Sequence, residues 1–281
     1  MAETNHPFLK IFDSQESLSF QKFILKSVRE MHIYRFAWIN FVVNSLRMRY
    51  RRSALGFLWS LLNPLLVMTV ISIVFAIIFK QDLRLFSIYI FSGLAPWWYM
   101  SAAILGGCQT LITAEGFLKK VYLPKMLFPL VSVTTETANF VFSLISLYIL
   151  ALILGTQIQW TIVFLPFAIL LTFIFNLGWA MMFSVATVYF RDLNQIMQVV
   201  FQALFYLAPI VYPLEMIPEQ FRSYFLYNPF YYFIILFRKA IYGEPAMTLS
   251  DWLIPVILAI MTLSIGLYLL MRGDRDIIYR L

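Results

Sequence analysis

Long apolar runs separated by short polar segments dominate the chain from residue 57 onward. A helix needs about 20 apolar residues to cross the ~30 Å hydrocarbon layer of a bilayer. Runs of sufficient length predict six membrane-spanning helices, at Phe57–Phe79, Leu85–Ile112, Leu127–Leu154, Ile162–Tyr189, Ile196–Leu214 and Trp252–Met271. Because these runs are continuous rather than alternating, they indicate helices and not the strands of a barrel. The pattern therefore predicts an all-α integral membrane protein.

A mixed pattern precedes the first apolar run, in Ser19–Tyr50, where apolar residues such as Phe23 and Phe41 are interspersed with Lys and Arg. This mixture predicts an amphipathic helix that lies in the membrane interface, with its cations near anionic lipid headgroups. A soluble helix packed on a partner protein would show the same pattern. We expect residues 1–56 to form a cytoplasmic N-terminal segment, and residues 1–30 lack the apolar core of a signal peptide.

The segment Asn228–Ile241 is apolar and aromatic, but it is too short to cross a bilayer comfortably. Pro218 and Pro229 are expected to break this region of the chain into two short helices. We therefore predict that residues 215–248 form a re-entrant hairpin in the outer leaflet, between the fifth and sixth spans. Residues 57–281 would then make up one six-span transmembrane domain.

The composition supports a membrane protein. Hydrophobic residues make up 62% of the 281 residues and charged residues only 12%, against about 25% charged in a soluble domain. The net charge of +7 would also suit a nucleic-acid-binding protein, but sixteen of the 21 Lys and Arg residues lie on segments that a six-span chain with an internal N-terminus keeps inside. This positive-inside bias predicts a bacterial inner-membrane protein with both termini in the cytoplasm, and no nucleic-acid partner.

The sequence lacks the motifs of common enzymes and metal sites. It contains no G-x-x-x-x-G-K-[ST] phosphate-binding loop and no H-E-x-x-H zinc motif, only two histidines (His6 and His32), and a single cysteine, Cys108. Asp274 and Asp276 have the D-x-D spacing of sugar-nucleotide sites, but in a charged tail a solvated face explains them better. We expect no catalytic residue, no metal and no cofactor on this chain.

Polar residues within the predicted spans are candidates for function. Glu136 is the only acid well inside a span, where it must face protein or water rather than lipid. It suits either a structural bond to a neighbouring helix or a place along a transport path. Gln195, Gln198, Gln202 and Tyr206 recur every three or four residues, so they share one helix face. Their amides predict that this face meets another helix or an aqueous lumen.

Aromatic residues lie on or near the glutamine face. Phe201, Phe205 and Tyr212 could stack on the apolar faces of sugars or simply pack against other helices. The candidate channel lining is therefore Gln195, Gln198, Phe201, Gln202, Phe205, Tyr206 and Tyr212.

The predicted cytoplasmic loop at residues 113–126 combines lysines with aromatic and apolar side chains. A short helix in this loop could offer Phe117, Val121 and Tyr122 to a groove on a partner. A basic loop anchored at the lipid headgroups explains the same residues equally well.

Several motifs, taken in order, resemble the transmembrane subunits of ABC transporters of the ABC-2 type that export polysaccharides such as O-antigen, capsule or teichoic acid. The resemblance extends over roughly residues 30–280. The segments that carry it are Arg49–Trp59, Leu62–Pro64, Ser92–Trp97, Lys119–Pro124, Tyr189–Asp192, Ala208–Pro213 and Asn228–Phe230. The chain departs from the pattern at Asn44-Ser45, where relatives often carry a charged pair.

The resemblance implies a homodimer of six-span subunits that assembles with two copies of a cytoplasmic ABC ATPase. ATP and Mg would bind to that partner. The substrate would be a lipid-linked polysaccharide that passes through a channel formed by the dimer. The second cytoplasmic loop would couple the permease to the ATPase through Phe117, Leu118, Lys119, Lys120, Val121, Tyr122, Leu123 and Pro124.

Two other functions fit parts of the sequence. An ABC-2 exporter of a small lipid or drug would need a compact apolar cavity instead of a continuous tunnel. A membrane glycosyltransferase or acyltransferase would need an acidic or histidine site at a membrane face, for which the sequence offers only Asp274 and Asp276.

Overall fold

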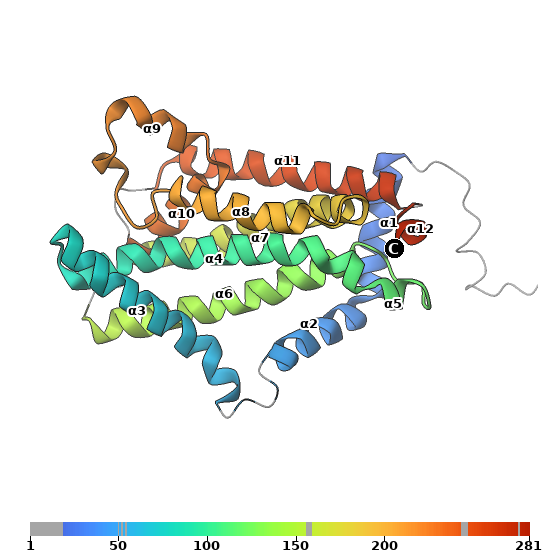
Figure 1. Ribbon diagram of the computed structural model, residues 1–281, viewed down its shortest axis with the longest axis horizontal. Coiled ribbons are helices and arrows are strands. Elements are labelled where there is room, and N and C mark those ends of the chain that lie inside the picture. The colour runs from blue at the N-terminus through green and yellow to red at the C-terminus, as the bar shows by residue number, and fades with distance from the viewer. Residues whose placement is uncertain are drawn as a thin grey trace, which may run out of the picture.

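The computed structural model describes residues 19–49, 51, 53, 55–155, 159–242, 247–274 and 276–281, and every regular element in these ranges is a helix. Four long helices form an elongated bundle: α4 (Leu83–Thr113), α6 (Leu127–Ile153), α7 (Leu165–Tyr189) and α11 (Leu249–Gly273). A fifth, α3 (Trp59–Phe79), leans away from the bundle at one end (Figure 1). The predicted all-α fold is confirmed.

Five helical segments in the described ranges are long and apolar enough to cross a membrane. They are α3, α4, α6, α11 and Trp160–Tyr189, which joins the 3₁₀ helix η3 (Trp160–Phe164) to α7. Five of the six predicted runs therefore lie on such helices, and the chain is an integral membrane protein.

The predicted run Ile196–Leu214 differs from the structure. The helix here, α8, covers Leu193–Tyr206. Its 14 residues extend only about 21 Å, less than the ~30 Å hydrocarbon layer. The helix ends before Pro209, which has no backbone N–H with which to continue it. The second half of this run is thus not helical, and a sixth span stays a prediction.

After α8 the chain forms three short helical elements at one end of the bundle (Figure 1): η4 (Leu214–Met216), α9 (Glu219–Leu226) and α10 (Pro229–Tyr242). The division into two short α-helices follows the prolines, as expected. Pro229 occupies the first turn of α10, and the Asn228 side chain accepts a hydrogen bond from the Phe230 N–H at 3.1 Å. Several side chains of α10, including Phe233 and Phe237, are fully buried. How deep this region lies in a membrane stays a prediction.

The sequence predicts one amphipathic helix within Ser19–Tyr50, but the described part of this segment forms two helices. α1 (Phe20–Ile33) begins at Ser19, whose hydroxyl caps it, and α2 (Arg35–Arg49) follows a turn at Tyr34. The one-turn helices α5 (Glu115–Leu118) and α12 (Ile277–Arg280) lie with α1 at one end of the bundle, opposite α9 and α10 (Figure 1). The first described helix, the loop between α4 and α6, and the C-terminus therefore share one end of the molecule.

Close helix crossings at small residues fix the bundle. A Cβ atom placed on Gly178 of α7 would lie 2.3 Å from the Thr262 carbonyl carbon of α11, and one on Gly107 of α4 would lie 2.5 Å from Cβ of Ala180. Such spacing lets helix backbones approach within a membrane, where van der Waals packing drives helix association.

Candidate functional site: the α4–α6 loop and the adjoining cleft

The loop between α4 and α6 begins with the one-turn helix α5. Glu115 and Lys119 form an ion pair at 2.6 Å across this turn, and Lys119 lowers the pKa of the Glu115 carboxyl by hydrogen bonding to it and by its positive charge. Leu118 and Pro124 are buried, so they anchor the loop on the bundle rather than offering a surface.

The exposed side of the same loop is apolar at its centre. Phe117 and Val121 are 52% and 59% exposed, and Lys119 and Lys120 beside them are also exposed. Two bulky apolar side chains flanked by cations on a protruding loop form a surface suited to a groove on another protein. We call Phe117, Lys119, Lys120 and Val121 the loop surface.

Two polar contacts connect this loop to distant parts of the chain. The Tyr122 hydroxyl donates to a Glu30 carboxylate oxygen of α1 at 2.8 Å. Burial and this carboxylate raise the pKa of Tyr122, so the hydroxyl stays protonated and can donate. Lys125 is buried, and its Nζ lies 2.6 Å from a carboxylate oxygen of Asp274 at the end of α11. A displacement of the loop would therefore act on both α1 and α11.

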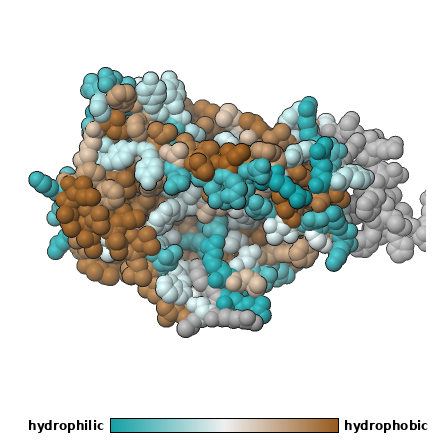
Figure 2. Space-filling view, in the orientation of Figure 1, coloured by the Kyte–Doolittle hydropathy of each residue, from teal (hydrophilic) through white to brown (hydrophobic). Residues whose placement is uncertain are grey.

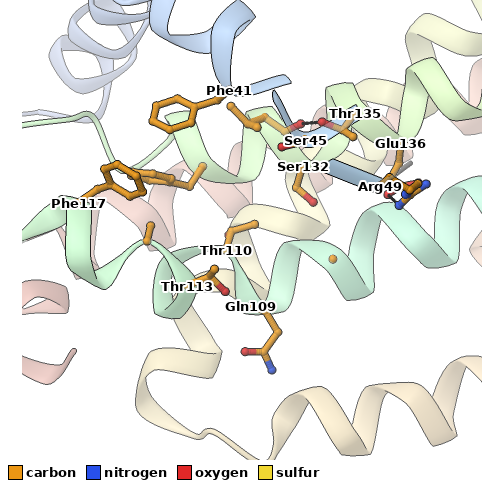
Figure 3. Close-up of a pocket in the computed structure, with 14 residues that line it drawn as sticks. Phe41, Ser45, Arg49, Gln109, Thr110, Thr113, Phe117, Ser132, Thr135 and Glu136 are labelled. Carbon is orange, nitrogen blue, oxygen red and sulfur yellow. Dashed lines mark hydrogen bonds and ion pairs between the residues drawn. The ribbon is translucent and has the colours of Figure 1, made fainter. Parts of the chain in front are cut away.

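A cleft of about 360 Å³ opens beside the loop, between α2, α4 and α6. The rings of Phe41 and Phe117, 5.6 Å apart, lie at one end of it, and Arg49 and Glu136 lie at the other (Figure 3). Its remaining polar lining comes from Ser45, Gln109, Thr110, Thr113, Ser132 and Thr135. The cleft is thus a recess with both polar and apolar lining that extends from the loop toward Glu136.

Glu136 has the protein partners that an acid within a span requires. Arg49 Nη2 donates to Glu136 Oε1 at 2.6 Å, and Asn139 Nδ2 donates to Oε2 at 3.0 Å. The pair also borders a second cavity of about 280 Å³, lined by residues of α3, α4 and α6 such as Asn63 and Trp98. The ion pair therefore joins α2 to α6 where two cavities meet.

The structure divides the seven candidate lining residues. Gln195, Gln198, Gln202 and Tyr206 are exposed along α8, and Figure 2 shows a hydrophilic band over this helix with apolar surface along α11. We call these four residues the glutamine stripe.

Three aromatic candidates lie elsewhere. Phe201 is 4% exposed and packs against Trp97 and Phe230 in the core, so it cannot line a channel in this conformation. Phe205 also turns toward Trp97, with ring centroids 5.9 Å apart. Tyr212 is partly buried and donates its hydroxyl to the Tyr206 carbonyl at 2.5 Å. The glutamine stripe is thus exposed, whereas both phenylalanines pack against Trp97.

Within the described residues, no group of three or more His, Cys, Asp or Glu could hold a metal ion. Cys108 is buried, and His6 lies outside the described residues. Asp274, the first acid of the D-x-D motif, forms an ion pair with Lys125. The middle residue of the motif, Arg275, lies outside the described residues.

Comparisons with known proteins identify the class. The family model of ABC-2 type transporters matches residues 38–242, and the chain belongs to this family of membrane proteins. It is similar to the O-antigen export system permease protein RfbA of Myxococcus xanthus, with 33% identity over 81% of this chain and 90% of that protein. An RfbA of Klebsiella pneumoniae is 28% identical over 69% and 75% of the two chains. The polysialic acid transport protein KpsM of Escherichia coli is 23% identical over 71% and 78%.

Proposed function

We propose that this chain is the channel-forming permease subunit of an ATP-driven exporter of lipid-linked polysaccharide, O-antigen or a related cell-surface glycan, in a bacterial inner membrane. The observation that carries the proposal is the similarity to an O-antigen export permease over 90% of that protein's length. The permease performs no covalent chemistry. ATP and Mg bind to a separate ABC ATPase.

The proposed topology has six spans with both termini in the cytoplasm. α8 and the chain that follows it make up the fifth span, and α9 with α10 forms the outer-leaflet hairpin. The positions of α1, α5 and α12 at one end of the bundle support this topology. So does the concentration of Lys and Arg on the segments assigned to the cytoplasm.

In the proposed assembly, two copies of the permease enclose the channel and two ATPase subunits bind below it. The exposed glutamine stripe on α8 supports such an assembly. Amide groups that faced hydrocarbon would lose their hydrogen bonds with water at a cost of several kcal/mol each. A second subunit or a hydrated, glycan-filled lumen supplies the missing partners.

The loop surface is the proposed docking point for the ATPase. When the ATPase subunits close on ATP, they move the loop. The loop then acts on α1 through Tyr122 and on α11 through Lys125. It acts on α2 through the ring contact of Phe117 with Phe41.

The test uses the full permease co-expressed and co-purified with its cognate ABC ATPase. The double variant Phe117→Ala with Val121→Ala removes the apolar centre of the loop surface. Phe221→Ala is the matched control, because Phe221 is 48% exposed but lies on α9 at the opposite end.

We expect the double variant to lose at least tenfold in ATPase recovered per permease, or in ATP hydrolysis per complex, while the control resembles the wild type. Equal recovery and hydrolysis in both variants would place the docking point elsewhere on the permease. A permease that binds no ABC ATPase, or that supports no glycan at the cell surface, would contradict the proposed function itself.

A further inference from the structure

A third cavity lies at the end of the bundle opposite the α4–α6 loop. Its volume is about 540 Å³, within the range of small-molecule sites. It is enclosed by α4, by the chain after α8, by α10 and by the start of α11. The lining is Tyr89, Pro209, Pro213, Leu214, Glu215, Tyr231, Tyr232, Ile235, Arg238, Lys239, Ser250, Asp251 and Ile254.

Buried charges hold the walls of this cavity in place. Arg238 is 8% exposed, and its guanidinium donates to the Pro209 and Ile210 carbonyls at 2.7 and 2.5 Å. The same group lies 3.9 Å from the ring centroid of Tyr89. These contacts tie the non-helical segment after α8 to α4 and α10, which gives the cavity a fixed shape.

An ion pair closes another wall of the cavity. Lys239 Nζ of α10 lies 2.7 Å from Asp251 Oδ2 of α11, and both side chains are about 15% exposed. The four charged residues of the lining, Glu215, Arg238, Lys239 and Asp251, sum to a formal charge of zero. Because both cations already contact carbonyl or carboxylate oxygens, the cavity offers little to attract a phosphate.

The remaining chemistry suits a sugar ring. Tyr231 and Tyr232 offer aromatic surface to the apolar C–H face of a pyranose. The exposed Glu215 carboxylate, the Ser250 hydroxyl and the rim of the Lys239–Asp251 pair offer hydrogen-bond acceptors and donors to its hydroxyl groups. An acyl chain would form no hydrogen bond with any of these groups.

We infer that this cavity is a glycan subsite that binds one or two uncharged glycosyl units at the outer end of the permease. This inference rests on the proposed function and adds a point of contact that is separate from the glutamine stripe. In the cavity, aromatic contacts and hydrogen bonds to neutral sugar hydroxyls would hold the glycan. These contacts are weak enough for a moving polymer to break and form again.

The test measures saturation-transfer NMR from the purified permease–ATPase complex in nanodiscs to neutral monosaccharides: mannose, galactose and N-acetylglucosamine. Tyr231→Leu removes the aromatic face but keeps the bulk, and Glu215→Gln removes the exposed carboxylate without changing its size. Tyr224→Leu is the matched control, since Tyr224 is 66% exposed on α9 and lies outside the lining.

We expect transfer to the ring C–H protons of at least one sugar in the wild type and in the control. In each lining variant the affinity should fall by about three- to tenfold, the size of one aromatic contact or one hydrogen bond. Absence of transfer to every sugar in the wild type, unchanged transfer in both lining variants, or displacement of the sugar by inorganic phosphate would each overturn the subsite. The same complex is assayed for ATPase binding and glycan export. If these persist without sugar transfer, only the subsite fails, whereas if they are absent, the proposed function fails.

Discussion

The crossing of α7 and α11 offers a sharp test of how this bundle is held together. Gly178 lies where the two helices meet. A Cβ atom there would be 2.3 Å from the Thr262 carbonyl carbon, 2.5 Å from the Leu263 nitrogen and 2.6 Å from the Thr262 oxygen. Gly266 faces the same point from α11, because a Cβ on it would lie 2.5 Å from the Gly178 oxygen. Ordinary contacts to a Cβ atom fall at 3.4–4 Å.

The change Gly178→Ala therefore requires α7 and α11 to move apart by about 1 Å. All the close atoms belong to backbone, so no side chain can rotate to relieve the clash. Overpacking of this kind costs about 1–3 kcal/mol, and a backbone clash belongs near 3 kcal/mol. Separated helices also lose dispersion contacts along their length, and no hydrophobic gain offsets that loss in lipid. At about 2–4 °C per kcal/mol, the apparent Tm should fall by about 6–12 °C.

The assay is thermal unfolding of the isolated permease in detergent, followed by size-exclusion fluorescence. Gly116→Ala is the matched control, since no atom lies within 4 Å of an added Cβ there. We expect the control to stay within about 1–2 °C of the wild type, as surface substitutions usually do. If Gly178→Ala unfolds at the wild-type temperature, the close crossing of α7 and α11 is not a determinant of stability and the reasoning is refuted.

Two further predictions concern ion pairs. Lys125→Met removes the cation beside Asp274 and should lower the free energy of unfolding by about 1–2 kcal/mol. The effect is no larger because the Asp274 carboxylate can still be hydrated. Chemical denaturation of the permease measures this change, and a value below about 0.5 kcal/mol would contradict the prediction. Glu136→Gln keeps the shape of the side chain but removes its charge. Since Arg49 is 45% exposed, the loss of the ion pair should cost only about 1 kcal/mol of stability. We expect trypsin to cleave within α2 several-fold faster in this variant than in the wild type. Unchanged cleavage would contradict the prediction.

The sequence by itself determined the class of protein and most of its helices. Continuous apolar length is a local property, so five predicted runs correspond to helices able to span a membrane. Proline also acts locally: α8 ends shortly before Pro209, and α10 begins at Pro229. The need of Glu136 for a protein or water partner followed from the cost of a charge in lipid. The motif order in the sequence predicted the family, which the family comparison then showed.

Tertiary structure decided which residue meets which. Spacing put Phe201 close to the glutamines on one helix, but the packing of Trp97 and Phe230 draws its ring into the core while the glutamines remain outside. Periodicity places residues on a helix face and says nothing of what covers that face. Glu136 pairs with Arg49, which lies 87 residues away in the sequence. The cavity lined by Arg238 likewise takes its shape only when distant segments pack together. These features depend on contacts distant in sequence, so no local pattern in the chain specifies them.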